Sequence, residues 1–121
     1  MYVVCLGDIA HGHIHTSARV ASEELVADQI MHASEILAQS ILELSKYVEK
    51  THVLATYGNH LRTVPNKKDN VHRDNLERLV RWWLEARLAP YEDIEVCKES
   101  DTEFLLFDVC AEYPSFLPRN F

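Results

Sequence analysis

Two short polar motifs, each placed directly after an apolar run, carry the side chains best suited to chemistry. Asp8 follows the run 2–6 and one glycine, and Asn59 and His60 follow the run 53–57 and another. A carboxylate can bridge two cations because each oxygen takes one metal, and an amide oxygen ligates a cation without adding charge. A histidine can donate a proton to a leaving alkoxide or hydrogen-bond a phosphoryl oxygen. Together the motifs predict a site for metal and phosphate.

Each motif also has a purely structural interpretation. Asp8 could cap a helix or form a turn. Asn59 could adopt the left-handed conformation of a turn, with His60 beside it by coincidence. Either motif alone is therefore a weak signal, and the functional interpretation depends on whether the chain brings the two together.

The other histidines carry less weight. Three of them alternate, and in an extended loop they would point the same way and form a zinc or nickel site: His11, His13 and His15. We favour the alternative that this is a solvated loop with incidental histidines. His32 and His52 are expected to be structural or exposed, and His72 to contribute little.

The elements that must position the motifs alternate between strand and helix. We expect strands over residues 2–6, 51–57, 94–97 and 104–109, and helices over 22–49 and from Asp69 or Asn70 to Leu88. The last two strands are expected to form a hairpin. The first helix shows apolar residues at spacings of three and four: Val26, Ile30, Ala33, Leu37, Ile41, Leu44 and Val48. The second shows Leu76, Leu79, Val80, Trp83, Leu84 and Leu88.

This order predicts an α/β fold with a layered β-α-β-α-β(β) core and a mostly parallel sheet. The run 2–6 is continuously apolar, which is typical of a parallel strand buried on both faces. In such sheets the ligand site lies outside the C-terminal ends of the strands, where Asp8 and Asn59 fall. We expect one domain over residues 1–110 and an irregular C-terminal tail over 111–121.

Composition sets the protein class. The chain has 121 residues, of which 47% are hydrophobic, and a net charge of -7, so it can build one packed core and is poorly suited to wrapping nucleic acid. Its three cysteines are widely spaced in apolar runs and are expected to be buried thiols: Cys5, Cys97 and Cys110. No apolar run is long enough to cross a bilayer, and no signal peptide is recognisable, so we expect a cytoplasmic protein.

The motifs resemble those of a known family. Gly7-Asp8, a long helix, a strand and then Gly58-Asn59-His60 look like the middle of the calcineurin-like metallophosphoesterases. The chain is similar in particular to phage-encoded and prophage-encoded members of that superfamily. The wider resemblance runs from Val3 through Arg87 and rests on Gly12, Ile14-His15, Arg62, Pro65-Asn66-Lys67-Lys68 and His72.

The resemblance implies a role for each matched position. Asp8 would bridge two metal ions, Asn59 would ligate one of them, and His60 would face the scissile phosphate. Arg62 would contact the phosphate. The family hydrolyses phosphomonoesters or phosphodiesters with metal-bound hydroxide, using Mn, Fe, Zn or Ni, so the implied substrate is a phosphoester, with nucleic acids and nucleotides among the candidates.

The chain departs from the family pattern in two places. It lacks the family's earlier Asp-x-His strand and its later histidine motifs, since no histidine follows His72. We therefore expect a fragment or truncated copy of a hydrolase, whose activity as this chain alone is doubtful. The alternative is a catalytically inactive α/β module that serves as an interaction or structural protein.

Two adjacent tryptophans, Trp82 and Trp83, cannot share one helix face. One is expected in the core and the other exposed or at an interface. Exposed apolar surface makes a homodimer a candidate assembly, and we expect no membrane partner. The basic residues Lys67, Lys68, Arg73 and Arg78 make only a small patch, which favours a solvated face over DNA binding.

Overall fold

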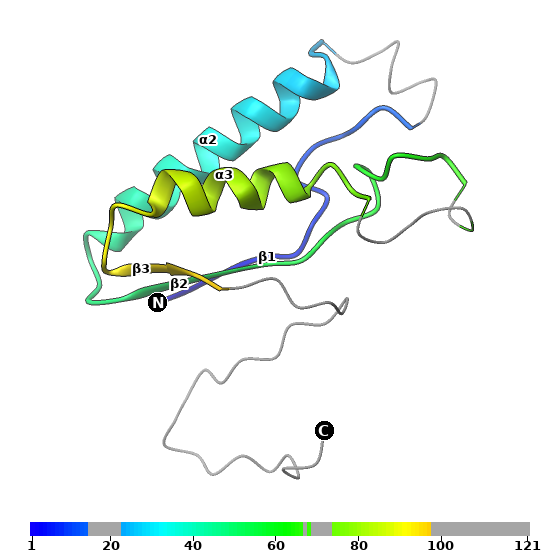
Figure 1. The fold of residues 1–121 in the computed structure, drawn as a ribbon. Coiled ribbons are helices and arrows are strands. Elements are labelled where there is room, and N and C mark those ends of the chain that lie inside the picture. The colour runs from blue at the N-terminus through cyan, green and yellow to red at the C-terminus, as the bar shows by residue number, and fades with distance from the viewer. Residues whose placement is uncertain (15–22, 67, 69–73, 98–121) are drawn as a thin grey trace, which may run out of the picture.

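The computed structural model describes residues 1–14, 23–66, 68 and 74–97. In chain order these contain β1 (Tyr2–Cys5), α2 (Val26–Ser45), β2 (Thr51–Ala55), α3 (Arg78–Leu88) and β3 (Ile94–Val96). The strands form a three-stranded parallel sheet in the order β1-β2-β3. Right-handed crossovers that step in one direction place their helices on one face, and Figure 1 shows α2 and α3 on the same side of the sheet. The predicted mixed α/β fold with a parallel sheet is confirmed.

One face of the sheet packs under the helices and the other does not. Val53 is buried in the core, and its register partners Val3 and Val96 pack against that core. The residues that precede these three in their strands form a second row. Their side chains point to the opposite face because side chains alternate along a strand. In that row the Tyr2 ring stacks on the His52 ring, with 5.0 Å between centroids.

Burial of β1 on both faces, predicted from the run 2–6, is wrong. Tyr2 is 40% and Val4 37% exposed, while Val3 lies toward the core. Both described helices cover the same face, so alternate residues of this strand lack a covering layer among the described elements. Leu6 lies beyond the end of the strand and is 77% exposed.

Helix α2 is shorter than predicted at both ends. It begins at Val26, because Leu25 has an extended backbone, and it ends at Ser45 rather than near residue 49. The predicted apolar stripe is also partly wrong, since Leu44 and Val48 are exposed. The line that is buried includes small side chains and consists of Ile30, Ser34, Ala38, Ile41 and Ser45. Ser34 and Ser45 on this line are polar, so a stripe of apolar residues does not predict their burial.

Helix α3 buries three predicted residues and one unexpected one. Val80, Leu84 and Leu88 lie in the core. Arg81 is only 6% exposed, and its guanidinium donates to the backbone carbonyl of Cys97 and to Glu85. Leu79, which the pattern placed in the apolar stripe, is 47% exposed.

The two tryptophans face different environments, as predicted. Trp83 is half-buried, and its Nε1 donates to Glu35 Oε2 at 2.9 Å. Trp82 is 62% exposed. One ring thus packs the two helices together, while the other lies at the surface.

Several predictions fall on residues outside the described ranges. These are the helix caps Asp69 and Asn70, the hairpin with a strand over 104–109, the tail 111–121, and the residues His15, His72 and Cys110. Of the other cysteines, Cys5 is buried, as predicted, and Cys97 is partly buried. Neither helix in the described part of the chain has the length and apolarity needed to cross a membrane.

Candidate metal and phosphate site

The two sequence motifs meet at one edge of the sheet. Because β1 and β2 are parallel and paired up to Cys5 and Ala55, the chain leaves both strands in the same direction. Asp8 Oδ1 accepts the backbone N–H of Asn59 at 2.7 Å and that of His60 at 3.0 Å. The carboxylate predicted to bind metal is therefore fixed against the loop that carries the amide and the imidazole. We call residues 7–12 and 57–62 together the strand-end junction.

Glycine makes this close approach feasible. A Cβ on Gly58 would lie 2.1 Å from Asp8 Oδ1 and 2.2 Å from the Asp8 backbone nitrogen, and a Cβ on Gly7 would lie 2.2 Å from the Gly58 nitrogen. Gly7 also has a φ of 89°, which disfavours a side chain. The two loops are thus in backbone-to-backbone contact.

The non-glycine residue with a left-handed backbone at the junction is Asp8 rather than Asn59. Asp8 has a φ of 55°, and it is the described non-glycine residue with positive φ. Aspartate tolerates this conformation better than most residues, although at an energetic cost. The structural interpretation of Asn59 as a left-handed turn residue is therefore wrong. The strained position carries the carboxylate itself, and such strain is characteristic of functional sites.

Glu77 is a member of the junction that sequence reasoning missed. It is only 2% exposed, and its two carboxylate oxygens accept different backbone amides. Oε1 accepts Ile9 N–H at 2.8 Å, and Oε2 accepts Gly58 N–H at 2.5 Å. Charged hydrogen bonds of this kind are stronger than neutral ones. Glu77 therefore ties the loop after β1 to the loop after β2.

Asn75 supports the same arrangement. Its Oδ1 accepts the Glu77 N–H at 2.9 Å, and its Nδ2 donates to the Gly58 carbonyl at 2.8 Å. No sequence signal marked these two residues, because a polar residue followed by a glutamate before a helix is usually read as a cap. Only the long-range contacts reveal what they bind.

Arg62 lies beside the junction but directs its guanidinium at the protein backbone. Nε donates to Val64 O at 3.0 Å, Nη1 to Asn59 O at 2.7 Å, and Nη2 to Pro65 O at 2.7 Å. The residue is 5% exposed. In this structure Arg62 shapes the loop that follows β2, and contact between Arg62 and a phosphate stays a prediction.

The histidines are distributed around the junction. The rings of His11 and His60 have centroids 6.4 Å apart. His13 Nδ1 is buried without a hydrogen-bond partner within the described structure. His32 is exposed beside Glu24 Oε1, and His52 stacks on Tyr2, so both have the structural or exposed roles predicted. Among residues 1–14, 23–66, 68 and 74–97, no group of three His, Cys, Asp or Glu is placed to hold a metal ion.

The donors at the surface of the junction are oxygen and nitrogen. Asp8, Asn59 and His60 are exposed residues, and no described group hydrogen-bonds Asp8 Oδ2. Cys5 lies behind them, where burial and then the negative charge of Glu77 raise the pKa of its thiol. Cys5 is buried, so the donors exposed at the junction are oxygen and nitrogen atoms, which suit a hard or borderline cation.

Comparisons with protein-family models, curated proteins and solved structures gave no match for this chain.

Proposed function

We propose that the strand-end junction is part of a metal-dependent phosphoester-hydrolysing site of the metallophosphoesterase kind, with Asp8 and Asn59 as metal ligands. The observation that carries the proposal is the pair of hydrogen bonds from the Asn59 and His60 amides to Asp8 Oδ1. These bonds occupy one carboxylate oxygen and leave Oδ2 for a cation. They also fix the backbone of the short loop that carries Asn59 and His60 against Asp8.

The chain's own residues would divide the work in a simple way. Asp8 and Asn59 would hold the cation, and the exposed imidazole of His60 would bind a phosphoryl oxygen or protonate the leaving group. A divalent ion bound here would neutralise phosphate charge and make its bound water more acidic. Glu77 would keep both loops in register without touching the substrate, and Arg62 would shape the loop after β2 beside the predicted phosphate.

A shallow hollow beside the junction offers space for the organic part of a phosphoester. It has a volume of about 650 Å³, and its wall includes Ile9, Ala10 and His11, which directly follow Asp8. His32 and Glu24 form part of its far side. The phosphate of a bound ester would thus lie at the junction, with its alcohol portion over this hollow.

Metal binding tests the proposal directly. Titration of the full chain with Mn²⁺, followed by calorimetry, should show binding that is lost in Asp8→Asn and weakened at least tenfold in Asn59→Ala. The matched control is Asp93→Asn, an exposed carboxylate just before β3, at the opposite end of the sheet. Absence of binding by the wild type, or equal losses in all three variants, would exclude the site.

Hydrolysis of bis-p-nitrophenyl phosphate with Mn²⁺ then separates catalysis from binding. His60→Ala should abolish turnover while leaving the Mn²⁺ affinity within about threefold of wild type. A wild-type chain that binds Mn²⁺ without turnover would support the second candidate function, an inactive module that acts through a partner. The observation that favours this second candidate is an apolar groove on the helical layer, which we call the α2–α3 groove. It is lined by residues outside the junction: Ala27, Ile30, Met31, Ser34, Leu79, Trp82 and Trp83.

A further inference from the structure

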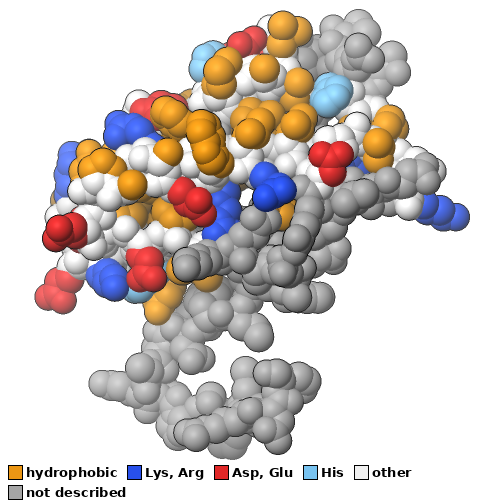
Figure 2. All heavy atoms as spheres, in the orientation of Figure 1, with side chains coloured by type: hydrophobic (Ala, Val, Ile, Leu, Met, Phe, Trp, Pro, Cys, Tyr) orange, Lys and Arg blue, Asp and Glu red, His pale blue; other side chains and the backbone are white. Residues whose placement is uncertain are grey.

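The sheet has an open face, which is the side opposite the helices that carries Val4 and Leu54. These two residues are register partners on β1 and β2, and they alternate with Val3 and Val53, which pack under the helices. No described helix or strand lies over the open face (Figure 1). The apolar side chains that Figure 2 shows gathered over α2 and α3 belong to the other side of the sheet.

Leu54 is more deeply buried than its place on the open face explains. It is 4% exposed, whereas its partner Val4 is 37% exposed. It is also not part of the hydrophobic core under the helices. Neighbouring strands shield the sides of such a side chain but not its outer end, so this burial requires further atoms above it. The difference between the two residues places that cover over β2 and away from β1.

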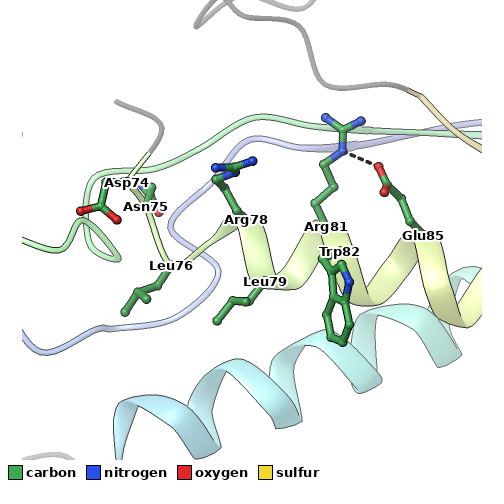
Figure 3. A pocket seen from close by; sticks show the side chains of 8 residues that line it. All are labelled: Asp74, Asn75, Leu76, Arg78, Leu79, Arg81, Trp82 and Glu85. Atoms are coloured by element: carbon green, nitrogen blue, oxygen red, sulfur yellow. Dashed lines mark hydrogen bonds and ion pairs between the residues drawn. The ribbon is translucent and has the colours of Figure 1, made fainter. Parts of the chain in front are cut away.

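The chain leaves β3 beside Leu54, on the side where the cover lies. Cys97 continues the ladder one residue past Val96, because its N–H donates to the Val53 carbonyl at 2.8 Å. Arg81 fixes the same point. Figure 3 shows its side chain projecting from α3 away from α2, and its guanidinium donates to the Cys97 carbonyl. The residues after Cys97 therefore start from a defined position at the edge of the open face.

The sequence after Cys97 has the composition of a covering segment. The six residues 98–103 are all polar, and the apolar-rich stretch Phe-Leu-Leu-Phe-Asp-Val follows them at 104–109. Because side chains alternate along an extended chain, Leu105, Phe107 and Val109 would form one wholly apolar side. Six residues span at most about 20 Å, and layers that pack face to face lie about 10 Å apart. The connection is thus long enough to bring 104–109 onto the open face.

We propose that residues 104–109 pack across the open face of the same molecule, with the side formed by Leu105, Phe107 and Val109 over Leu54. Strand β2 has 5 residues and is about 17 Å long, which matches the roughly 20 Å of six extended residues. A short tether holds the segment at a millimolar effective concentration, which favours this intramolecular contact over capture of another chain. The proposal does not depend on the metal site.

This arrangement differs from the hairpin expected from the sequence. In that hairpin, residues 104–109 would pair with the free edge of β3 and leave the outer end of Leu54 uncovered. The two arrangements therefore predict different effects of a substitution at Leu54.

Limited proteolysis of the full chain by chymotrypsin tests the proposal, because Phe104 and Phe107 are cleavage sites within the segment. Mass spectrometry would follow cleavage there, with a synthetic peptide of residues 98–121 as the unprotected reference. The wild type should be cut at least tenfold more slowly than the peptide. Leu54→Ala should lose most of this protection, because it removes the surface on which the segment packs.

The matched control is Leu88→Ala, the same substitution at a buried residue of the core under the helices. Cleavage of the segment should stay within twofold of wild type in this variant, and circular dichroism checks that both variants are folded. A second measurement needs no variant. Nuclear Overhauser contacts between the Phe107 ring and the Leu54 methyl groups should appear in spectra of the wild type.

Three results would overturn the proposal. One is wild-type cleavage as fast as that of the peptide. Another is protection that Leu54→Ala leaves unchanged in the absence of Phe107–Leu54 contacts, which is the result for a hairpin at the edge of β3 or for packing in the α2–α3 groove. The third is protection that appears only as the chain is concentrated from about 5 to 200 µM, which would place the segment on a second copy.

Discussion

The strand-end junction and the α2–α3 groove are built from opposite kinds of contact. At the junction, the carboxylates of Asp8 and Glu77 accept four backbone amides, at distances from 2.5 to 3.0 Å. In the groove the lining is mainly apolar, and its polar contacts include the bonds from Trp83 Nε1 to Glu35 and from Ser34 Oγ to the Ile30 carbonyl. Directional bonds define a single geometry, whereas apolar packing tolerates change. The junction therefore has one defined geometry, whereas the groove offers an adaptable apolar surface.

The largest expected difference between the two regions comes from Gly58→Ala. The added methyl would lie 2.2 Å from a backbone nitrogen, which a side-chain rotation cannot relieve. We expect a loss of at least about 3 kcal/mol in the free energy of unfolding, measured by urea denaturation. Trp82→Ala in dilute solution should cost less than about 1 kcal/mol, because the ring is mostly exposed. Equal losses would remove the contrast between the regions.

Removal of one charged acceptor should have an intermediate effect. In Glu77→Gln, the amide can accept only one of the two backbone N–H groups, and its own NH₂ faces the other. The cost of a buried unpaired donor is about 2 kcal/mol. The amide proton signals of Ile9 and Gly58 should also shift upfield in NMR spectra, because charged hydrogen bonds move them downfield.

The exposed Glu92→Gln serves as the control for this substitution. It should change stability by less than about 0.5 kcal/mol and leave both amide signals in place. Unchanged Ile9 and Gly58 signals in Glu77→Gln would show that the carboxylate does not hold the two loops in solution.

The smallest expected effect is a pH dependence from Cys5, which lies behind the junction. Burial, followed by the charge of Glu77, raises the pKa of this thiol in the folded chain. Its contribution to stability is complete below the ordinary thiol pKa of about 8.5. Above that pH the unfolded chain releases its proton first, so stability falls as pH rises through the folded pKa. A Cys5→Ala variant should show a shallower decline in urea midpoint between pH 8 and 10.

Cys97 provides the internal comparison for that experiment. Burial and the charge of Glu95 raise its pKa, while Arg81 lowers it. This thiol is partly buried, so a disulfide reagent should label it faster than Cys5. Faster labelling of Cys5 would mean that the junction opens more readily than the structure indicates.

Local patterns were sufficient for much of the fold. Apolar runs followed by glycine located β1 and β2 to within about two residues, and the short stretch 94–97 located β3. The 3.6-residue period located both helices but not the start of the second, since α3 begins only at Arg78. Parallel pairing followed from the alternation of strand and helix. Because parallel neighbours end at one edge, the sequence also predicted that Asp8 would lie near Asn59 and His60, and this juxtaposition is what the structure shows.

Other features depended on contacts between distant segments. The buried line of α2 includes the polar residues Ser34 and Ser45, which hydrophobic periodicity does not count as core residues. The exposure of Tyr2 and Val4 depends on both helices lying on one side of the sheet, which is a property of strand order rather than composition.

The sequence by itself determined the element order, the parallel sheet and the placement of a carboxylate, an amide and an imidazole at adjacent strand ends. These follow from periodicity and connection rules, which act over short stretches of chain. Only the tertiary structure assigned Glu77 to bind the amides of Ile9 and Gly58, and Arg62 to bind backbone carbonyls. A hydrogen bond between residues 68 positions apart depends on how whole elements pack, and no local pattern encodes it.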